Sequence, residues 1–217
     1  VHDKEEASRQ YGIDINSIYT IPHAVYEFAK PQVRQITKGK AKEVLFFGRI
    51  IPYKGLDILL DAWPAISEAV PGARLKIAGE GNCSKVKDFI DSRPEITLDN
   101  RFVADDEIEG ILDVAHLVVL PYRRASQSGV IAAAMGCGLP VVCTDVGALA
   151  EQVEDGVTGI IAKEVTSEAI AASVIAALSD AAFYERMSIN TLKRVEERFS
   201  WGAVGTQLVE IMSGEQI

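Results

Sequence analysis

The fold of this chain is decided by the stretch VLFFGRIIPYKGLDILLDAW, residues 44–63. Its first residues form a continuous apolar run, which is typical of a strand buried on both faces of a sheet. After a short turn, large apolar residues recur at the i, i+3, i+4, i+7 spacing of an amphipathic helix, at Leu56, Leu59, Leu60 and Trp63. The stretch therefore predicts a strand, a loop and a helix in succession.

The same alternation continues along the rest of the chain. Further apolar runs that predict strands lie at 73–78, 96–103, 116–120, 140–143 and 158–162. Helical patterns fall between and after them, at 108–112, 129–137, 167–178, 181–197 and 201–212. Repeated alternation favours an α/β fold with a doubly wound, Rossmann-like parallel sheet, right-handed crossovers and strand order 3-2-1-4-5-6.

The composition is that of an ordinary folded protein. The 217 residues are 48% hydrophobic and 24% charged, so extended disorder is not expected. The formal net charge of −9 disfavours nucleic acid as a partner, because an acidic chain repels the phosphate backbone. An anionic ligand would have to be held by a local cluster of Arg and Lys.

Cysteine and histidine usage points away from a metal site. Cys83, Cys137 and Cys143 form no CxxC pair, and the three histidines lie far apart in sequence. Unpaired thiols of this kind predict a cytoplasmic protein, with a peripheral position at the inner membrane face as a further possibility. The sequence has no apolar run of transmembrane length, and we expect no signal peptide. Because it does not begin with Met, we expect a chain cut from a longer protein.

Topology selects two candidate binding loops. In a doubly wound sheet, ligands bind beyond the carboxyl ends of the strands, where the strand order reverses. With the predicted order, this point lies between strands one and four, so the loops after Gly48 and Leu120 matter most. In the first loop, Gly48 permits close approach of a ligand, and Arg49 and Lys54 supply positive charge for an anion. The alternative is a pair of solvated cations beside a turn.

The second loop, 121–130, is small and polar and opens a helix. Free backbone N–H groups at this helix start, with Ser128 and Gly129, predict a nest for an anion. A plain N-cap by Ser126 or Ser128 is the better interpretation of this loop alone. The functional interpretation gains weight because both loops meet at the same reversal point.

A third glycine-rich stretch, Gly79-Glu80-Gly81, follows the second strand rather than the first. With the next residues it reads GxGxxS, which falls short of the dinucleotide-binding pattern, so a dehydrogenase is disfavoured. A structural turn is the favoured interpretation, with a role in lining the crevice as the alternative.

Five stretches carry a family resemblance. They are FFGRIIPYKGLDILLDAW (46–63), IAGEGN (77–82), RFVADDEIEGILDVAHLVVLPY (101–122), QSGVIAAAMGCGLPVVCTDVGALAEQVEDGVTGIIA (127–162) and FSW (199–201). Together they resemble the carboxyl-terminal domain of retaining GT-B-fold glycosyltransferases of the group 1 or family 4 type, which includes sucrose synthase and polysaccharide-assembly enzymes. The resemblance implies a linker or tail at 1–22, a nucleotide-sugar-binding domain at 23–217, and a missing amino-terminal domain that binds the acceptor.

The resemblance also implies roles for the candidate residues. Contacts to the donor diphosphate are implied for Gly48, Arg49, Lys54 and the backbone of Ser128, Gly129 and Val130. Backbone contacts to the nucleobase and ribose are implied for Phe102 and Val103. The donor would be a UDP-sugar or, as second choice, a GDP-sugar. No cofactor and no metal is implied, because the chain has no D-x-D motif and fixed cations can stabilise the leaving phosphate.

The sequence departs from the family pattern at two positions. The family usually has two Glu residues that contact the sugar and the ribose hydroxyls, and Ala125 and Ala133 stand at the matching positions. Gln127 lies beside the predicted anion nest and is our candidate for a hydrogen bond to the sugar.

Three functions remain open on the sequence alone. The first is the donor domain of a retaining hexosyltransferase, inactive when isolated and with its catalytic residues unassigned. The second is a nucleotide-sugar epimerase of the same fold. The third is a non-catalytic nucleotide-binding or regulatory module, which the loss of both Glu residues favours. The sequence does not indicate the acceptor.

Overall fold

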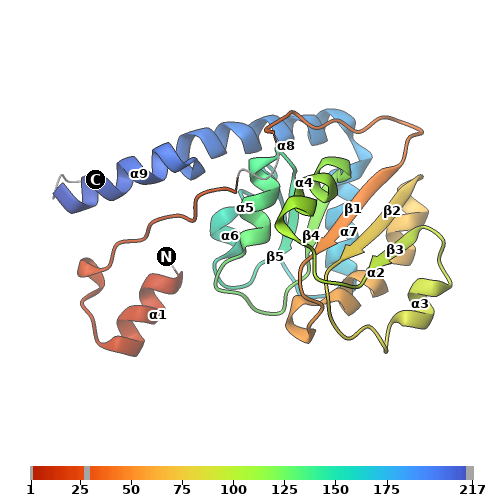
Figure 1. Ribbon diagram of the computed structural model, residues 1–217, viewed down its shortest axis with the longest axis horizontal. Helices are drawn as coiled ribbons and strands as arrows, with labels where there is room; N and C mark the ends of the chain where they lie inside the picture. The colour runs from red at the N-terminus through yellow and green to blue at the C-terminus, as the bar shows by residue number, and fades with distance from the viewer. Residues whose placement is uncertain (1, 27–29, 214–217) are drawn as a thin grey trace.

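The computed structural model describes residues 2–26 and 30–213, and its centre is a six-stranded parallel sheet (Figure 1). The strands are β1 (Lys42–Phe47), β2 (Ala73–Ala78), β3 (Ile96–Asp99), β4 (Leu117–Leu120), β5 (Val141–Thr144) and β6 (Gly159–Ala162). Their order in the sheet is β3-β2-β1-β4-β5-β6, and every neighbouring pair is parallel. The predicted doubly wound sheet and its strand order are confirmed.

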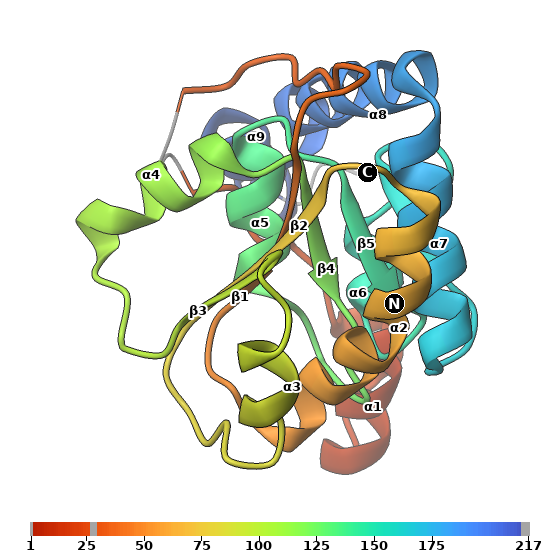
Figure 2. The ribbon, with the colours of Figure 1, turned by 90° about the vertical axis from the view of Figure 1, so that its right-hand side faces the viewer.

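Helices cover both faces of the sheet. Within the described residues they are α1 (His2–Tyr11), α2 (Leu56–Ala69), α3 (Lys87–Asp91), α4 (Asp105–Val114), α5 (Gly129–Gly136), α6 (Leu149–Gln152), α7 (Ser167–Ser179), α8 (Ala181–Arg194) and α9 (Trp201–Ser213). Short turns add the 3-10 helices η1 (Ile15–Ser17) and η2 (Pro52–Lys54) and the π-helix η3 (Val195–Phe199). Figure 2 shows the strands between α2 and α7 on one side and α4 and α5 on the other.

The two faces of the sheet bury separate apolar cores, because successive side chains of a strand point to opposite faces. On β1, Val44 and Phe46 pack into the core under α2 and α7, whereas Leu45 packs into the core under α4 and α5. All three side chains are at most 1% exposed. Burial on both faces explains why this strand is continuously apolar rather than alternating.

Two elements end three or four residues earlier than the sequence predicts. The third strand ends at Asp99 and not at residue 103, so the apolar pattern overestimates its length. Directly after it, the side-chain amide of Asn100 exchanges two hydrogen bonds with the backbone of Gly81, at 2.9 and 3.0 Å, where a longer strand would pair. The predicted helix 181–197 ends as α8 at residue 194 and continues as η3.

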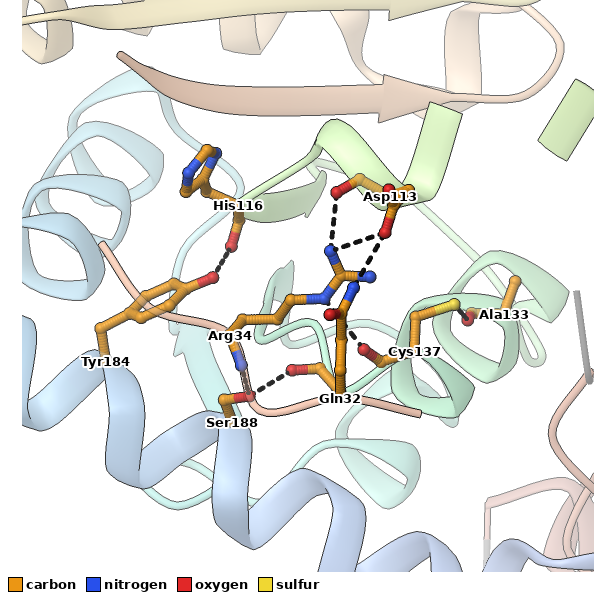
Figure 3. A network of polar contacts seen from close by, with 9 residues as sticks. Gln32, Arg34, Asp113, His116, Ala133, Cys137, Tyr184 and Ser188 are labelled. Carbon is orange, nitrogen blue, oxygen red and sulfur yellow. Dashed lines mark hydrogen bonds and ion pairs between the residues drawn. The ribbon is translucent and has the colours of Figure 1, made fainter. Parts of the chain in front are cut away.

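A buried arginine joins the carboxyl ends of two helices (Figure 3). Arg34 is 7% exposed; its Nε donates to the Cys137 carbonyl at 3.1 Å and its Nη1 to the Asp113 carbonyl at 2.7 Å. These carbonyls lie at the ends of α5 and α4, where a cation also meets the negative end of the helix dipole. The backbone N–H of Arg34 donates to Ser188 Oγ on α8 at 2.7 Å. The side chain of Arg34 thus ties α4 and α5, and its backbone N–H ties α8, to the segment that leads into β1.

Helices α1 and α9 lie at one end of the molecule, away from the sheet (Figure 1). No residue of α9 is buried, and Trp201 and Met212 are 63% and 79% exposed. The segment after α1 runs beside α9, where Gln207 Nε2 donates to the Thr20 carbonyl at 3.4 Å. Within the described chain, no single helix is long and apolar enough to cross a membrane, although α7 with 181–213 passes that test as a pair bent by 95°.

Candidate functional site

The candidate site lies at the carboxyl ends of β1 and β4, where the strand order reverses. The loop after β1 (48–55) and the loop after β4 (121–128) pack against each other there. Gly55 has a φ of +68° and lies so close to the Pro121 carbonyl that a Cβ at this position would collide with it. Both the left-handed backbone and the close approach require glycine.

Arg123 fastens these two loops together. Its guanidinium donates to both carboxylate oxygens of Asp57, at 2.9 and 2.6 Å, and its Nη1 donates to the Pro52 carbonyl at 2.7 Å. Its backbone N–H donates to the Tyr53 carbonyl at 2.8 Å. The bidentate hydrogen bonds hold the pKa of Asp57 below its usual range. Arg123 is therefore committed to joining the loops.

Lys54 extends into the space between the loops. A Cβ added to Gly48 would lie 2.7 Å from Lys54 Nζ and 3.9 Å from Val130 Cγ2, so the missing side chain of Gly48 makes room for the ammonium. The Nζ atom lies 5.1 Å from the ring centroid of Tyr122, within cation–π range. Burial and, to a smaller extent, the charge of Arg49 lower the pKa of Lys54. An anion bound here would offset both effects.

A cavity of about 840 Å³ opens beside Lys54. Its wall consists mainly of residues 124–130, the first turns of α4 and α5, and the side chains of Tyr26, Tyr53 and Tyr122. A space of this size is typical of small-molecule and cofactor sites.

The structure brings most of the predicted contact residues to this cavity. Its lining includes five of them, Lys54, Gln127, Ser128, Gly129 and Val130. Gly48 lies behind Lys54, and Arg49 is exposed beside it. Phe102 and Val103 are different: they are 69% and 8% exposed, and neither lines the cavity. Their predicted contacts involve backbone groups and stay predictions.

The start of α5 is capped from within the protein. Ser128 is its N-cap, and the Ser128 hydroxyl accepts from the Val130 N–H at 3.3 Å, which confirms the N-cap interpretation. The Ser128 N–H donates to Gln152 Oε1 at 2.8 Å, and Gln152 Nε2 donates to the Ser128 carbonyl at 3.2 Å. Two of the three predicted phosphate-binding N–H groups thus have internal partners. Across residues 2–26 and 30–213, the Gly129 N–H shows none.

Two further contacts fix the loop after β4 to the next strand and turn. Thr144 Oγ1 donates to the Tyr122 carbonyl at 2.6 Å. Gly147, at a φ of +55°, approaches the Ala125 carbonyl so closely that a Cβ would collide with it. Sequence reasoning missed Thr144, Gly147 and Gln152, because the contacts join residues more than 20 positions apart.

The glycines after β2 serve close backbone packing. A Cβ on Gly79 would collide with the Gly48 carbonyl, and a Cβ on Gly81 would collide with the Ile50 carbonyl. The Ile50 N–H donates to the Glu80 carbonyl at 2.7 Å between them. The structural interpretation of this stretch is therefore confirmed. Residues 79–81 pack against the backbone of the loop after β1 and support it.

Both alanines at the family's glutamate positions face the cavity. Ala125 and Ala133 belong to its lining, so the wall lacks the two carboxylates that the resemblance would place there. Asp105, at the start of α4, brings a carboxylate to the same cavity. Tyr26 adds an aromatic wall, since its ring lies 3.3 Å from where a Cβ of Gly129 would be.

The described residues offer no metal site. Within 2–26 and 30–213, no group of three or more His, Cys, Asp or Glu side chains could hold a metal ion. All three cysteines are free and buried, as predicted. Burial raises the pKa of Cys143 to about 12, so its thiol stays protonated at neutral pH.

The architecture defines an α/β domain of the Rossmann type, with a ligand cavity at its topological switch point. Residues 41–180 match the family of group 1 glycosyl transferases. The chain belongs to this family.

Relatives support the same assignment. An uncharacterized glycosyltransferase of Methanocaldococcus jannaschii is 32% identical over an alignment of 177 residues that covers 78% of this chain and 44% of the relative. The alpha-D-kanosaminyltransferase of Streptomyces kanamyceticus is 29% identical over 77% of this chain and 44% of the relative. The chain thus spans about half the length of the curated relatives it matches.

Solved structures match the fold over most of the chain. Sucrose-phosphate synthase from Thermosynechococcus elongatus superposes with a TM-score of 0.76 at 21% identity, over 98% of this chain and 56% of that one. HepE from Anabaena, in complex with UDP-glucose, gives a TM-score of 0.67 at 25% identity, over 80% of this chain and 49% of HepE. The carboxyl-terminal domain of a group 1 glycosyl transferase from Francisella tularensis gives a TM-score of 0.64 at 19% identity, over 74% of this chain and 87% of that domain. The fold is the Rossmann-like half of a GT-B glycosyltransferase.

Proposed function

We propose that the cavity binds a nucleotide-diphosphate sugar and that the chain is the donor-binding domain of a glycosyltransferase. The observation that carries this proposal is that Lys54 and the start of α5 line one cavity, with the ammonium of Lys54 held against the bare backbone of Gly48. A diphosphate would offset the burial and the like charge that lower the pKa of Lys54. The start of α5 adds the Gly129 N–H and the positive end of a helix dipole.

UDP is the nucleotide that the comparisons favour. HepE is similar to 80% of the length of this chain, and its structure is solved in complex with UDP-glucose. GDP is the second choice. Gln127, which is exposed on the cavity rim, is the proposed partner of a sugar hydroxyl.

The complete enzyme would hold its acceptor on a second domain. The exposed apolar side chains of α9 and the half-length match to relatives support such a domain. In this proposal residues 1–22 link the domains and 23–217 bind the donor, in the cytoplasm. Transfer would retain the anomeric configuration and need no metal, with fixed cations stabilising the leaving diphosphate.

The test is a titration of the chain with UDP, GDP and ADP, followed by backbone amide NMR. UDP is expected to shift the amides of Gly48, Lys54, Gln127 and Gly129, and to do so equally with magnesium or with a chelator. Shifts that avoid both loops would contradict the donor site. A dependence on magnesium would contradict only the metal-free part of the proposal.

A second candidate is a non-catalytic nucleotide-binding module of the same fold. It is favoured by Ala125 and Ala133, which leave the cavity without two carboxylates. The isolated chain is expected to bind nucleotide weakly and to transfer nothing in either case, since sites of this fold close between two domains. Sugar transfer or donor hydrolysis by the full-length protein separates the two candidates: a module that only binds shows neither.

A further inference from the structure

The cavity beside Lys54, in which we propose that the donor binds, is called the donor cavity. A second cavity lies on the other side of η2 from it. It encloses about 1070 Å³. The loop after β1 separates the two spaces, and Tyr53 and Arg124 line both of them. The outer wall of the second cavity comes from the segment after β2, through Asn82, Lys85 and Val86. The two cavities are therefore neighbours at the same edge of the sheet.

The charges of this cavity leave two cations without acidic partners. Asp57 and Arg123 both line it and neutralise each other through their bidentate contact. Lys85 and Arg124 are exposed, and within the described chain neither has a carboxylate within salt-bridge distance. In a chain with a net charge of −9, a cavity with this local excess of positive charge favours an anion.

Apolar side chains make up most of the remaining wall of this second cavity. Ile50 and Leu56 form its floor and are 7% and 5% exposed, and Ile51, Pro52 and Val86 continue the same surface. Among the neutral polar side chains of the wall, Asn82 already accepts a hydrogen bond from the Ser84 N–H at 3.0 Å through its side-chain oxygen. Two cations above an apolar floor match a ligand with one anionic group and an apolar body.

We propose that this second cavity binds a phosphomonoester with an apolar substituent. The phosphate would lie between Lys85 and Arg124, and the substituent would cover Ile50 and Leu56. Because Arg124 and Tyr53 line both cavities, the bound group would sit beside the donor. Its role as the anionic part of the acceptor rests on the proposed function, whereas the binding itself does not.

The test uses this chain, hexyl phosphate, inorganic phosphate, glucose 6-phosphate and hexanol, each titrated and followed by amide NMR. Hexyl phosphate is expected to shift the amides of 81–86 and 123–124 and to bind at least several-fold more tightly than the three other probes. Equal affinity for inorganic phosphate or glucose 6-phosphate would overturn the apolar part of the site. Equal affinity for hexanol would overturn the anionic part, and shifts confined to other segments would overturn the site.

Lys85 and Lys87 form a matched pair of variants. Lys87 lies two residues away but pairs with Asp91 at 2.9 Å and does not line the cavity. Lys85→Ala is expected to weaken hexyl phosphate binding about three- to tenfold, a range suited to an exposed cation. Lys87→Ala is expected to leave it unchanged. Equal losses in both variants would reduce the effect to net charge and reject the site.

The donor and phosphomonoester sites can fail independently. Lys54→Met removes a cation of the donor cavity and is expected to weaken UDP binding while leaving hexyl phosphate binding unchanged. A chain that binds hexyl phosphate at 81–86 but ignores UDP would reject the proposed donor and keep the second site. The reverse result would keep the donor and reject the second site.

Discussion

Lys54 is the residue on which the proposed donor site depends most. Its ammonium lies against the open backbone of Gly48, and burial lowers its pKa. Lys54→Met keeps the apolar stem and removes the charge, so UDP affinity is expected to fall by about 1.5–3 kcal/mol, the usual worth of a hydrogen bond to a charged group. Calorimetric titration measures this change.

The matched control for Lys54 is Lys38→Met. Lys38 is exposed and precedes the amino end of β1, at the opposite edge of the sheet, and it carries the same charge. This variant is expected to bind UDP as the unmodified chain does. If both variants lose affinity equally, Lys54 acts only through net charge and the proposed contact is wrong.

His116 makes stability depend on pH. Its Nδ1 accepts a hydrogen bond from the Glu43 N–H at 3.1 Å, and burial, Arg34 and Lys42 lower its pKa below the usual 6.5. Below pH 6.5 the unfolded chain binds a proton that the folded chain excludes, so this contribution to stability is present above that pH and is lost as pH falls through the lower folded value. We expect the melting temperature to fall between pH 7.5 and pH 5.5.

His116→Asn isolates this contribution, because an amide oxygen can still accept from the Glu43 N–H but does not titrate. Burial raises the pKa of the Glu43 carboxyl, which acts in the opposite direction and is common to both proteins. The pH-dependent fall in melting temperature is expected to be smaller in the variant. Equal falls would show that His116 contributes nothing to the pH dependence.

At the scale of elements, the contact between the loops after β1 and β4 is sensitive to a single added carbon. Gly55 and Gly156 have nearly the same backbone, with φ of +68° and +72°, but a Cβ on Gly156 would meet no atom within 4 Å. Gly156→Ala is expected to lower the free energy of unfolding by about 1 kcal/mol, because alanine is strained in a left-handed backbone. Gly55→Ala is expected to lower the free energy of unfolding by at least about 2 kcal/mol more, because the added Cβ forces the two loops apart.

Urea unfolding of the two glycine variants measures this difference. The change in the free energy of unfolding is read from the midpoint at constant slope. Similar losses in both variants would mean that the loop after β4 moves aside without cost. The two loops would then not act as one rigid unit.

The sequence predicts the elements of this fold better than the contacts between them. Apolar runs such as 44–48 and 117–120 mark strands because burial on both faces leaves a local signature. The reversal point, and with it Lys54 and Gly129, then follows from topology. Gln152 could not be found this way, because its amide meets Ser128 across a sequence separation of 24 positions. Asn100 ends β3 through a similar non-local contact with Gly81.

At the scale of the whole molecule, Arg34 links the layers. It holds the carboxyl ends of α4 and α5, whose amino ends line the donor cavity. Arg34→Met removes both hydrogen bonds and leaves the Asp113 and Cys137 carbonyls without this donor, so the free energy of unfolding is expected to fall by about 3 kcal/mol. Arg74→Met, at an exposed position of β2, serves as the control and is expected to change the free energy of unfolding little.

Urea unfolding of the Arg34 variant provides the measurement, with amide NMR as a second readout. Shifts are expected to extend from α4 and α5 to the amides near Gly129, because the two helices lose their common anchor. A loss below about 1 kcal/mol, within the range of surface substitutions, would show that packing alone sets the helix positions.

The five attachments of the 121–128 loop, through Gly55, Arg123, Thr144, Gly147 and Gln152, have a kinetic consequence. A nucleotide that arrives finds the wall already in its final shape, so little conformational entropy is lost on binding. Association with this domain should then proceed in one step whose observed rate is linear in ligand concentration, and any slow phase in the full-length protein would belong to the approach of the proposed second domain.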